Sequence, residues 1–423
     1  MAKIAKSDKD FLNKLKISEE EARELTAILT ASIKTHKSNH LKINTVNFVL
    51  RTLNFTLHPS TIMITEEALD FLSTLLDTPS PTGMEMDAQR LWAEYMKPYT
   101  DEQQCDAYGS TWAVLKSKQA NAPTLMLDAH ADEIGFSIRH IGSDGFVYVE
   151  RLGGSDVAIA RGRRLRFFGT DGEVTGVIGN TAIHIRDDQD KAPKLWELYV
   201  DFGCDSREEV EALGLRVGDR GVYCDGPLML NNGKRLVCRA LDDRLCGFIL
   251  AETARRLKEQ GVEPAWNIVF ANTVQEEVGC IGAAMLTYRI QPDAAICLDV
   301  THATDSPGLN TARYGEVKLG KGGCLCFGPA CHPNLNARIE YVVDKTGIPM
   351  QRETSGRTTG TNTDQIFRSR SGVPATNFSL PLRYMHSPVE TADMADVENM
   401  IDLLVAFIEE LKVTDDFRHK LEL

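Results

Sequence analysis

The sequence lacks any apolar run long enough to cross a membrane, which argues against an integral membrane protein. Its first residues, Met1–Lys16, are charged and lack the apolar core of a secretory signal. The ten cysteines show none of the paired spacing that builds a disulfide framework, and several lie in apolar stretches. We therefore expect reduced thiols in a cytoplasmic protein.

An excess of positive charge is also missing. The net charge of −13 argues against a nucleic-acid partner and against binding to an anionic membrane surface. Hydrophobic residues at 43% and charged residues at 25% give the balance of a folded globular protein. A chain of 423 residues is too long for one ordinary core, so we expect two domains and an appendage.

Charge, glycine spacing and the pattern of apolar segments divide the chain into three regions. Residues 1–60 are net positive, unlike the rest, and contain a helical apolar pattern, which predicts an accessory N-terminal helical extension. Residues 61–137 and 237–423 alternate apolar strands with helices, which predicts an α/β domain with a doubly wound mixed sheet. Between them, residues 138–236 form short segments separated by glycines, which predicts a small inserted β-barrel-like domain.

Two adjacent acids, Glu276 and Glu277, follow the apolar run from Trp266 to Ala271. Neighbouring carboxylates at a buried strand end repel each other and lose water, so they need a cation or a shared proton. One arrangement has one glutamate bind a divalent metal while the other takes a proton from metal-bound water. The alternative is that both face solvent at the start of a helix.

Other predicted strand ends and helix starts also carry metal-type side chains. His130 and Asp132 follow an apolar strand and, being two residues apart on extended backbone, point the same way. Asp242 is able to bridge two cations, whereas its neighbour Asp243 is placed to cap the following helix. Asp299 ends a further apolar run. Because ligands gather at the carboxyl ends of strands in open α/β sheets, this pattern favours a metal site.

His386 is the fifth candidate ligand and precedes a helix that we expect to start near Thr391.

A separate group of thiols with an imidazole also lies in the C-terminal third: Cys324, Cys326, Cys331 and His332. Its spacing matches no standard zinc finger and it has no second knuckle, so we favour a purely structural role for this group.

In their order along the chain, these motifs resemble those of the tetrahedral and glutamyl aminopeptidase family of co-catalytic two-metal peptidases, some of which carry endoglucanase labels. The matching motifs lie at residues 130–135, 240–244, 274–279, 298–300 and 383–388. Five ordered motifs are specific together, although each alone is weak. The family usually starts close to residue 65, so residues 1–60 depart from its pattern.

The resemblance implies an aminopeptidase that removes N-terminal residues from peptides through a metal-bridged water. It implies two divalent ions per subunit, with zinc expected and cobalt or manganese as alternatives. Asp242 would bridge the ions, Glu276 would be the general base, and Asp132 would support the site. The implied metal ligands are His130, Asp242, Glu277, Asp299 and His386. The residues that bind the substrate stay unassigned.

The resemblance also implies a homo-oligomer. Members of the family form dimers through the inserted domain and often closed tetrahedral dodecamers. Three other functions remain open: a metal-dependent deacylase or amidohydrolase with the same site, a glycosidase, and a non-catalytic binding protein. A glycosidase needs two carboxyls separated across a sugar, and a binding protein would be expected to have lost a ligand or the base.

Overall fold

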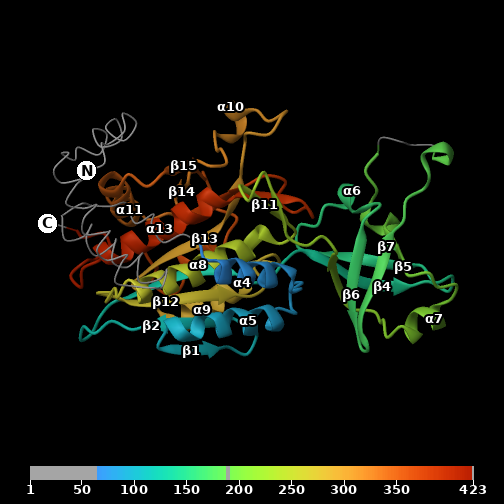
Figure 1. Cartoon of the computed structure of the whole chain (residues 1–423), viewed down its shortest axis with the longest axis horizontal. Helices are drawn as coiled ribbons and strands as arrows, with labels where there is room; N and C mark the ends of the chain where they lie inside the picture. The colour runs from blue at the N-terminus through green and yellow to red at the C-terminus, as the bar shows by residue number, and fades with distance from the viewer. Residues whose placement is uncertain (1–63, 187–190, 422–423) are drawn as a thin grey trace, which may run out of the picture. The chain divides into compact units, whose positions relative to one another are not determined.

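The computed structural model describes residues 64–186 and 191–421 of the chain (Figure 1). The extension predicted over residues 1–60 lies outside these ranges. Within them, no helix has both the length and the apolar character needed to cross a membrane. All ten cysteines lie inside the described ranges and are free thiols, in line with the reduced state expected from their spacing.

An eight-stranded mixed sheet has the strand order β1-β2-β12-β3-β13-β16-β14-β15. Its four central strands are parallel neighbours: β12 (Asn267–Thr273), β3 (Thr124–His130), β13 (Ala294–His302) and β16 (Ala375–Leu382). They are buried along nearly their whole length, as expected of strands covered on both faces. Because they are parallel, their carboxyl ends meet at one edge of the sheet.

The outer strands make the sheet mixed. β1 (Glu102–Cys105) and β2 (Thr111–Leu115) run antiparallel on one side. On the other side, β14 (Gly323–Phe327) is antiparallel to β16, and β15 (Met350–Thr354) is parallel to β14. The mixed α/β sheet predicted from the sequence is thus confirmed.

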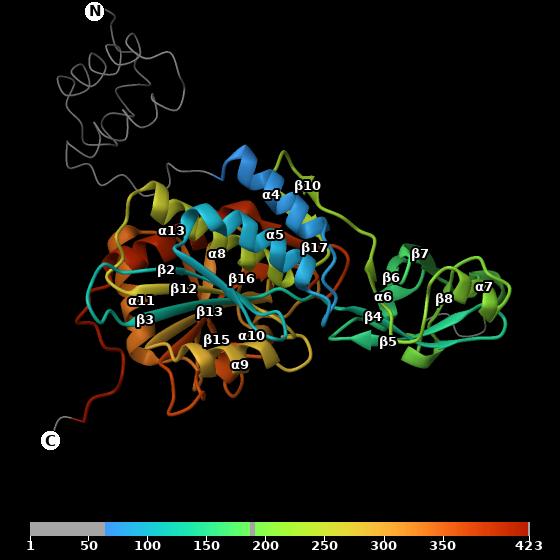
Figure 2. The ribbon, with the colours of Figure 1, turned by 90° about the horizontal axis from the view of Figure 1, so that it is seen from below.

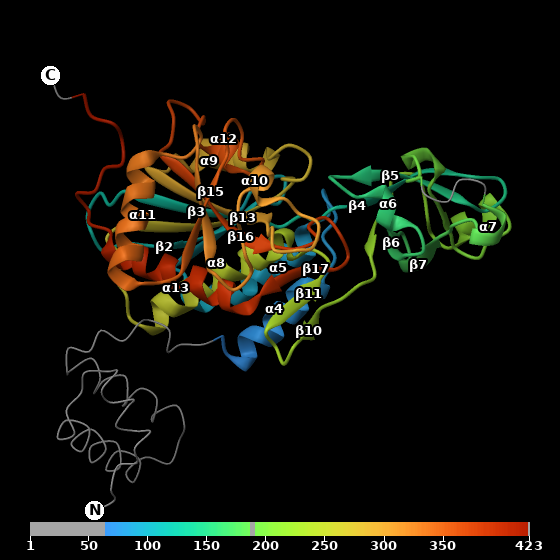
Figure 3. The same ribbon diagram turned by 90° about the horizontal axis from the view of Figure 1, so that it is seen from above.

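Helices cover both faces of this sheet, and Figures 2 and 3 show the two groups on opposite sides. One group shares the largest hydrophobic core and consists of α4 (Glu66–Asp77), α5 (Met86–Met96), α8 (Leu241–Glu259), α11 (Pro333–Thr346) and α13 (Met394–Glu410). The other group consists of α9 (Ile281–Ile290) and α12 (Thr363–Ile366), which pack on β12, β13 and β16.

The helix expected near Thr391 begins later, at Met394. Residues Glu390–Asp393 instead form β17, which pairs with β11 (Arg235–Cys238), and Asp393 caps α13 by accepting a hydrogen bond from the Ala395 amide. Pairing with a distant strand therefore outweighs the local helical pattern. β10 (Leu228–Leu230) completes this three-stranded sheet.

A closed barrel with the order β4-β5-β8-β7-β6-β9 confirms the predicted barrel-like region. Its strands are β4 (Gly135–Ile141), β5 (Val147–Leu152), β6 (Arg164–Gly169), β7 (Gly172–Ile178), β8 (Tyr199–Asp201) and β9 (Arg220–Tyr223). Side chains such as Phe136, Phe167 and Val200 fill its own core. The short helices are η1 (Lys97–Tyr99), α6 (Val157–Ala160), η2 (Ile183–Ile185), η3 (Leu195–Glu197), α7 (Arg207–Ala212) and α10 (Thr311–Tyr314).

A buried arginine, Arg244, ties the start of α8 to the segment after α4. Its guanidinium donates to Ser80 Oγ at 3.0 Å and to the carbonyl of Leu75 at 2.8 Å. It also pairs with the carboxylate of Glu133, and both side chains are at most 2% exposed. Since Glu133 directly follows Asp132, this network fixes the loop that carries two candidate functional residues.

We predict that Arg244→Met lowers the free energy of unfolding by about 3 kcal/mol, because it leaves the Glu133 carboxylate buried without its main partner. Denaturant unfolding would measure the change. Arg90→Met is the matched control: Arg90 pairs with Asp87 on the surface, so its effect should stay within about 0.5 kcal/mol. A loss below about 1 kcal/mol for Arg244→Met would contradict this role.

Candidate functional site

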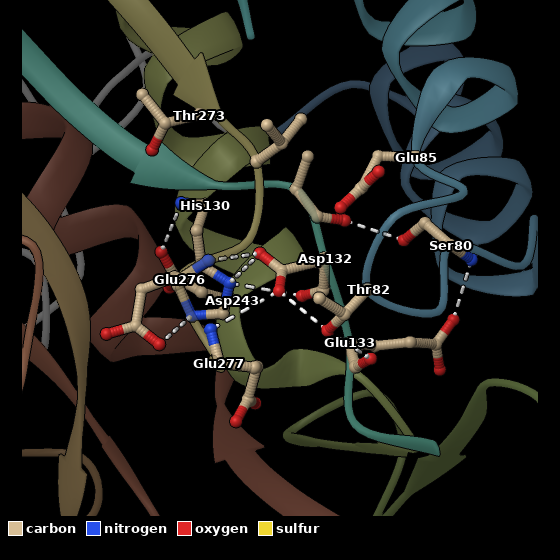
Figure 4. Close-up of polar contacts among 12 residues, drawn as sticks. Ser80, Thr82, Glu85, His130, Asp132, Glu133, Asp243, Thr273, Glu276 and Glu277 are labelled. Atoms are coloured by element: carbon tan, nitrogen blue, oxygen red, sulfur yellow. Dashed lines mark hydrogen bonds and ion pairs between the residues drawn. The ribbon is translucent and has the colours of Figure 1, made fainter. Parts of the chain in front are cut away.

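The residues singled out in the sequence come together at the carboxyl edge of the four central strands. Figure 4 shows His130, Asp132, Glu276 and Glu277 among them. His130 is the last residue of β3, and Asp299 lies near the end of β13. Glu276 and Glu277 follow β12, and the turn after β16 carries His386. Asp242 stands in the first turn of α8.

Two groups of side chains bring metal-ligand atoms within 4.8 Å of one another in the described part of the chain: His130, Asp243 and Asp299, and Asp242, Glu277 and His386. Asp242 lies between the groups. Its Oδ1 is 3.1 Å from Nε2 of His130, and its Oδ2 is 3.2 Å from Nε2 of His386. One oxygen of Asp242 thus faces each group, which is the geometry required of a bridging carboxylate.

The two adjacent glutamates differ in their surroundings. Glu277 Oε1 lies 3.5 Å from Nε2 of His386, inside the second group. Glu276 belongs to neither group, and its Oε2 lies 4.0 Å from Nε2 of His130. The thiol of Cys280 donates to Glu276 Oε1 at 3.2 Å. Glu277 therefore lies within a group of candidate ligands, and Glu276 lies beside the groups.

Asp132 holds both sides of the site in place (Figure 4). Its Oδ1 accepts the Glu276 amide at 2.9 Å, and its Oδ2 accepts the Thr82 hydroxyl at 2.8 Å and the Glu277 amide at 3.3 Å. Nδ1 of His130 is 3.0 Å from the Asp132 carbonyl and 3.4 Å from its Oδ1. Such contacts fix the orientation of an imidazole whose other nitrogen faces a metal.

Two carboxylates of the site were not predicted as functional. Asp243 was expected to cap α8, yet no side chain caps that helix, and its Oδ2 accepts the His130 backbone amide at 3.1 Å. Glu390, fully buried, accepts the Asp242 amide at 3.1 Å and the His386 amide at 2.7 Å. The sequence feature that could have indicated Glu390 is its position, four residues after the candidate ligand His386.

A turn of two glycines, Gly153 and Gly154, packs directly on two candidate ligands. A Cβ at Gly154 would lie 2.3 Å from Nδ1 of His386, and one at Gly153 would lie 2.7 Å from Oε2 of Glu277. Gly153 also has φ +63°, a conformation that favours glycine. The turn that follows β5 thus closes one side of the site without room for a side chain.

The site buries more negative charge than its two histidines can neutralise. Burial raises the pKa of Glu277 to about 8 and the pKa of Asp299 well above its usual value. Burial would also raise the pKa of Asp242, but hydrogen bonds from His130 and His386 outweigh it and lower that pKa. In return, and against the effect of burial, the Asp242 carboxylate raises the pKa of His386 to about 10.

Divalent cations fit this arrangement. Asp243 Oδ1 and Asp299 Oδ2 are buried without a hydrogen-bond partner, and both belong to the group that contains His130. Buried carboxylates of this kind are stable when a cation binds them. The mixture of imidazole and carboxylate donors suits zinc, and also cobalt or manganese.

The chain is similar in sequence and fold to known aminopeptidases. The model of the M42 glutamyl aminopeptidase family matches residues 109–403. The lysyl aminopeptidase of Pyrococcus furiosus is 35% identical over 350 residues, which cover 82% of this chain and 98% of that protein. The structure of an aminopeptidase from the archaeon Desulfurococcus kamchatkensis matches with a TM-score of 0.76 at 34% identity. The match covers 82% of this chain and 96% of that aminopeptidase. The TET1 peptidase of Pyrococcus horikoshii matches with a TM-score of 0.71 at 29% identity, over 81% of this chain and 100% of that peptidase.

We predict that Asp132→Asn weakens zinc binding by roughly 10- to 100-fold, because the amide cannot accept from all the donors that now surround the carboxylate. Titration against a chelator of known affinity would measure the change. Asp106→Asn is the control, since Asp106 also accepts several backbone amides (Tyr108, Gly109 and Ser110) but belongs to neither ligand group. Unchanged zinc affinity in Asp132→Asn would contradict the assigned role.

Proposed function

Because the chain belongs to the M42 glutamyl aminopeptidase family, whose members are metal-dependent peptidases, we propose that it hydrolyses the N-terminal residue from peptides at the site described above. The observation that carries this proposal is the position of Asp242. Its two oxygens face two separate histidines, each within a group of three ligand-type side chains. A site of this form suits two divalent ions that share one carboxylate.

The proposed ligands come from both groups, and Asp243 is assigned to accept the His130 amide instead. His130 and Asp299 would complete one ion, Glu277 and His386 would complete the other, and Asp242 would be shared. Zinc is the proposed metal, with cobalt and manganese as alternatives. When bound, the ions would lower the pKa of a water molecule and polarise the peptide carbonyl.

Glu276 is the proposed general base. It stands outside both ligand groups, and its side chain is 11% exposed. Burial raises its pKa, which strengthens it as a proton acceptor. It would take a proton from the attacking water and pass it to the departing amine. Asp132, which accepts the Glu276 amide, would keep this carboxylate in position.

The proposed organisation has residues 61–137 and 237–423 as the catalytic domain, residues 138–236 as an inserted domain for dimerisation and assembly, and residues 1–60 as an accessory extension. The Pyrococcus horikoshii relative can assemble into a tetrahedron or a large octahedral shell, which supports a homo-oligomer here. A dimer is the proposed building block, with the tetrahedral dodecamer as the larger form. Ten free thiols support a cytoplasmic location.

We predict that Glu276→Gln lowers kcat by at least about 100-fold while two metal ions per chain remain bound, because the amide removes the base alone. Glu277→Gln is the matched comparison at the next residue and should lower metal content as well as kcat. Kinetics combined with elemental analysis would separate the two. A Glu276→Gln variant within about tenfold of the native kcat would remove Glu276 from the role of base.

We further predict that a peptide with a free N-terminus is cleaved faster than its N-acetylated counterpart. A free amine can offer its lone pair to a divalent ion, whereas acetylation delocalises that lone pair into an amide and adds bulk. The matched peptides would be compared at equal concentration with zinc, cobalt and manganese in turn. Faster hydrolysis of the acetylated peptide with every metal would favour a deacylase over an aminopeptidase.

A further inference from the structure

A cavity of about 1280 Å³ begins next to the candidate ligand Asp299. Val300 and Thr301, which follow Asp299 on β13, line it, and so does Glu353 on β15. Much of the wall is apolar and comes from Leu309, Val317, Phe327, Leu382 and Met385. Among the charged residues that line the cavity, Glu353 is half-buried, whereas His302, Arg313, Glu316 and Arg352 are exposed.

Glu353 lies on the same face of the sheet as Asp299. Thr301 stands two residues beyond Asp299 and so shares its face, about 7 Å along the strand. Ser379 on β16 is the register partner of Asp299. The Glu353 carboxylate accepts a hydrogen bond from Thr301 Oγ1 at 2.5 Å and another from Ser379 Oγ at 2.8 Å. Two hydroxyls thus hold this carboxylate at a fixed distance from the candidate ligand.

Within residues 64–186 and 191–421, no lysine, arginine or histidine lies within ion-pair distance of Glu353. The neighbouring Arg352 pairs with Glu340 and stacks on Phe327, 3.8 Å from the ring centroid. Burial raises the pKa of Glu353, while the hydrogen bonds from Thr301 and Ser379 lower it. A half-buried carboxylate whose hydrogen bonds come from hydroxyls is poorly compensated, so a cation entering the cavity would be bound favourably.

We propose that Glu353 selects peptides whose N-terminal residue is lysine or arginine. The inference rests on the proposed aminopeptidase function, which places the amine and the scissile carbonyl at the Asp299 end of the cavity. The four-carbon stem of a lysine would run along the apolar wall, and its ammonium group would pair with Glu353. An acidic side chain would meet a second carboxylate there, and a leucine would leave Glu353 without a cation.

The test compares peptides that are identical except for the first residue, which is lysine, norleucine or glutamate. Norleucine keeps the four-carbon stem and lacks the ammonium group. With the full chain loaded with zinc, kcat/KM for the lysine peptide should exceed that for the norleucine peptide by roughly 10- to 100-fold. The glutamate peptide should be the slowest of the three.

Glu353→Gln should lower kcat/KM for the lysine peptide to the level of norleucine, and change the norleucine value by less than about threefold. Glu316→Gln is the control. Glu316 also lines the cavity but is exposed and pairs with Lys318, so its variant should keep the native preference.

Two results would overturn the inference. One is native protein that cleaves the norleucine or glutamate peptide as fast as the lysine peptide, a result that needs no variant. The other is a Glu353→Gln variant that slows all three peptides equally. Hydrolysis of none of the three by the zinc-loaded native protein would instead overturn the proposed aminopeptidase function, and the inference with it.

Discussion

The structure depends on the burial of carboxylates that its own cations do not balance. Six carboxylates converge on two histidines, and all but Glu276 and Glu277 are buried: Asp132, Asp242, Asp243, Glu276, Glu277 and Asp299. Isolated charges in such a place would be expelled or neutralised. The buried charge of Asp242 is stabilised locally, since each of its oxygens faces one imidazole. Divalent ions would neutralise the rest, which links the stability of this edge of the sheet to metal binding.

The fold supplies the rigidity that this burial requires. Parallel strands bring His130, Asp299 and the segment with Glu276 to one edge, and backbone amides are satisfied by carboxylates around it. Asp132 accepts the neighbouring amides of Glu276 and Glu277, and Glu390 accepts the amides of Asp242 and His386 from two separate segments. Contacts of this kind would hold the proposed ligands in position. At metal sites, removing such contacts commonly changes metal affinity by about 10- to 100-fold.

Much of this was predictable because strand ends are local features of a sequence. An apolar run followed by an acid or histidine identified His130, Glu277 and Asp299, and their meeting at one edge follows from parallel pairing. Asp243 was assigned to a helix cap, because local preference gives no information on a contact with the distant His130 amide. The helix expected near Thr391 begins at Met394 for a similar reason, since β17 pairs with β11 across a gap of about 150 residues. No functional role for Glu353 could be predicted from the sequence, because it is a lone acid in a short strand. Its role is suggested by its contacts with Thr301 and Ser379, which are distant in the sequence.

Asp242 is proposed to lie between two metal ions. Crystals grown with zinc, measured at wavelengths on both sides of the zinc absorption edge, would locate each ion independently of any assumption about its ligands. Two anomalous peaks per chain are expected, separated by about 3.5–4 Å, with one Asp242 oxygen directed to each. A single peak, or two peaks of which one has no contact with Asp242, would contradict the account.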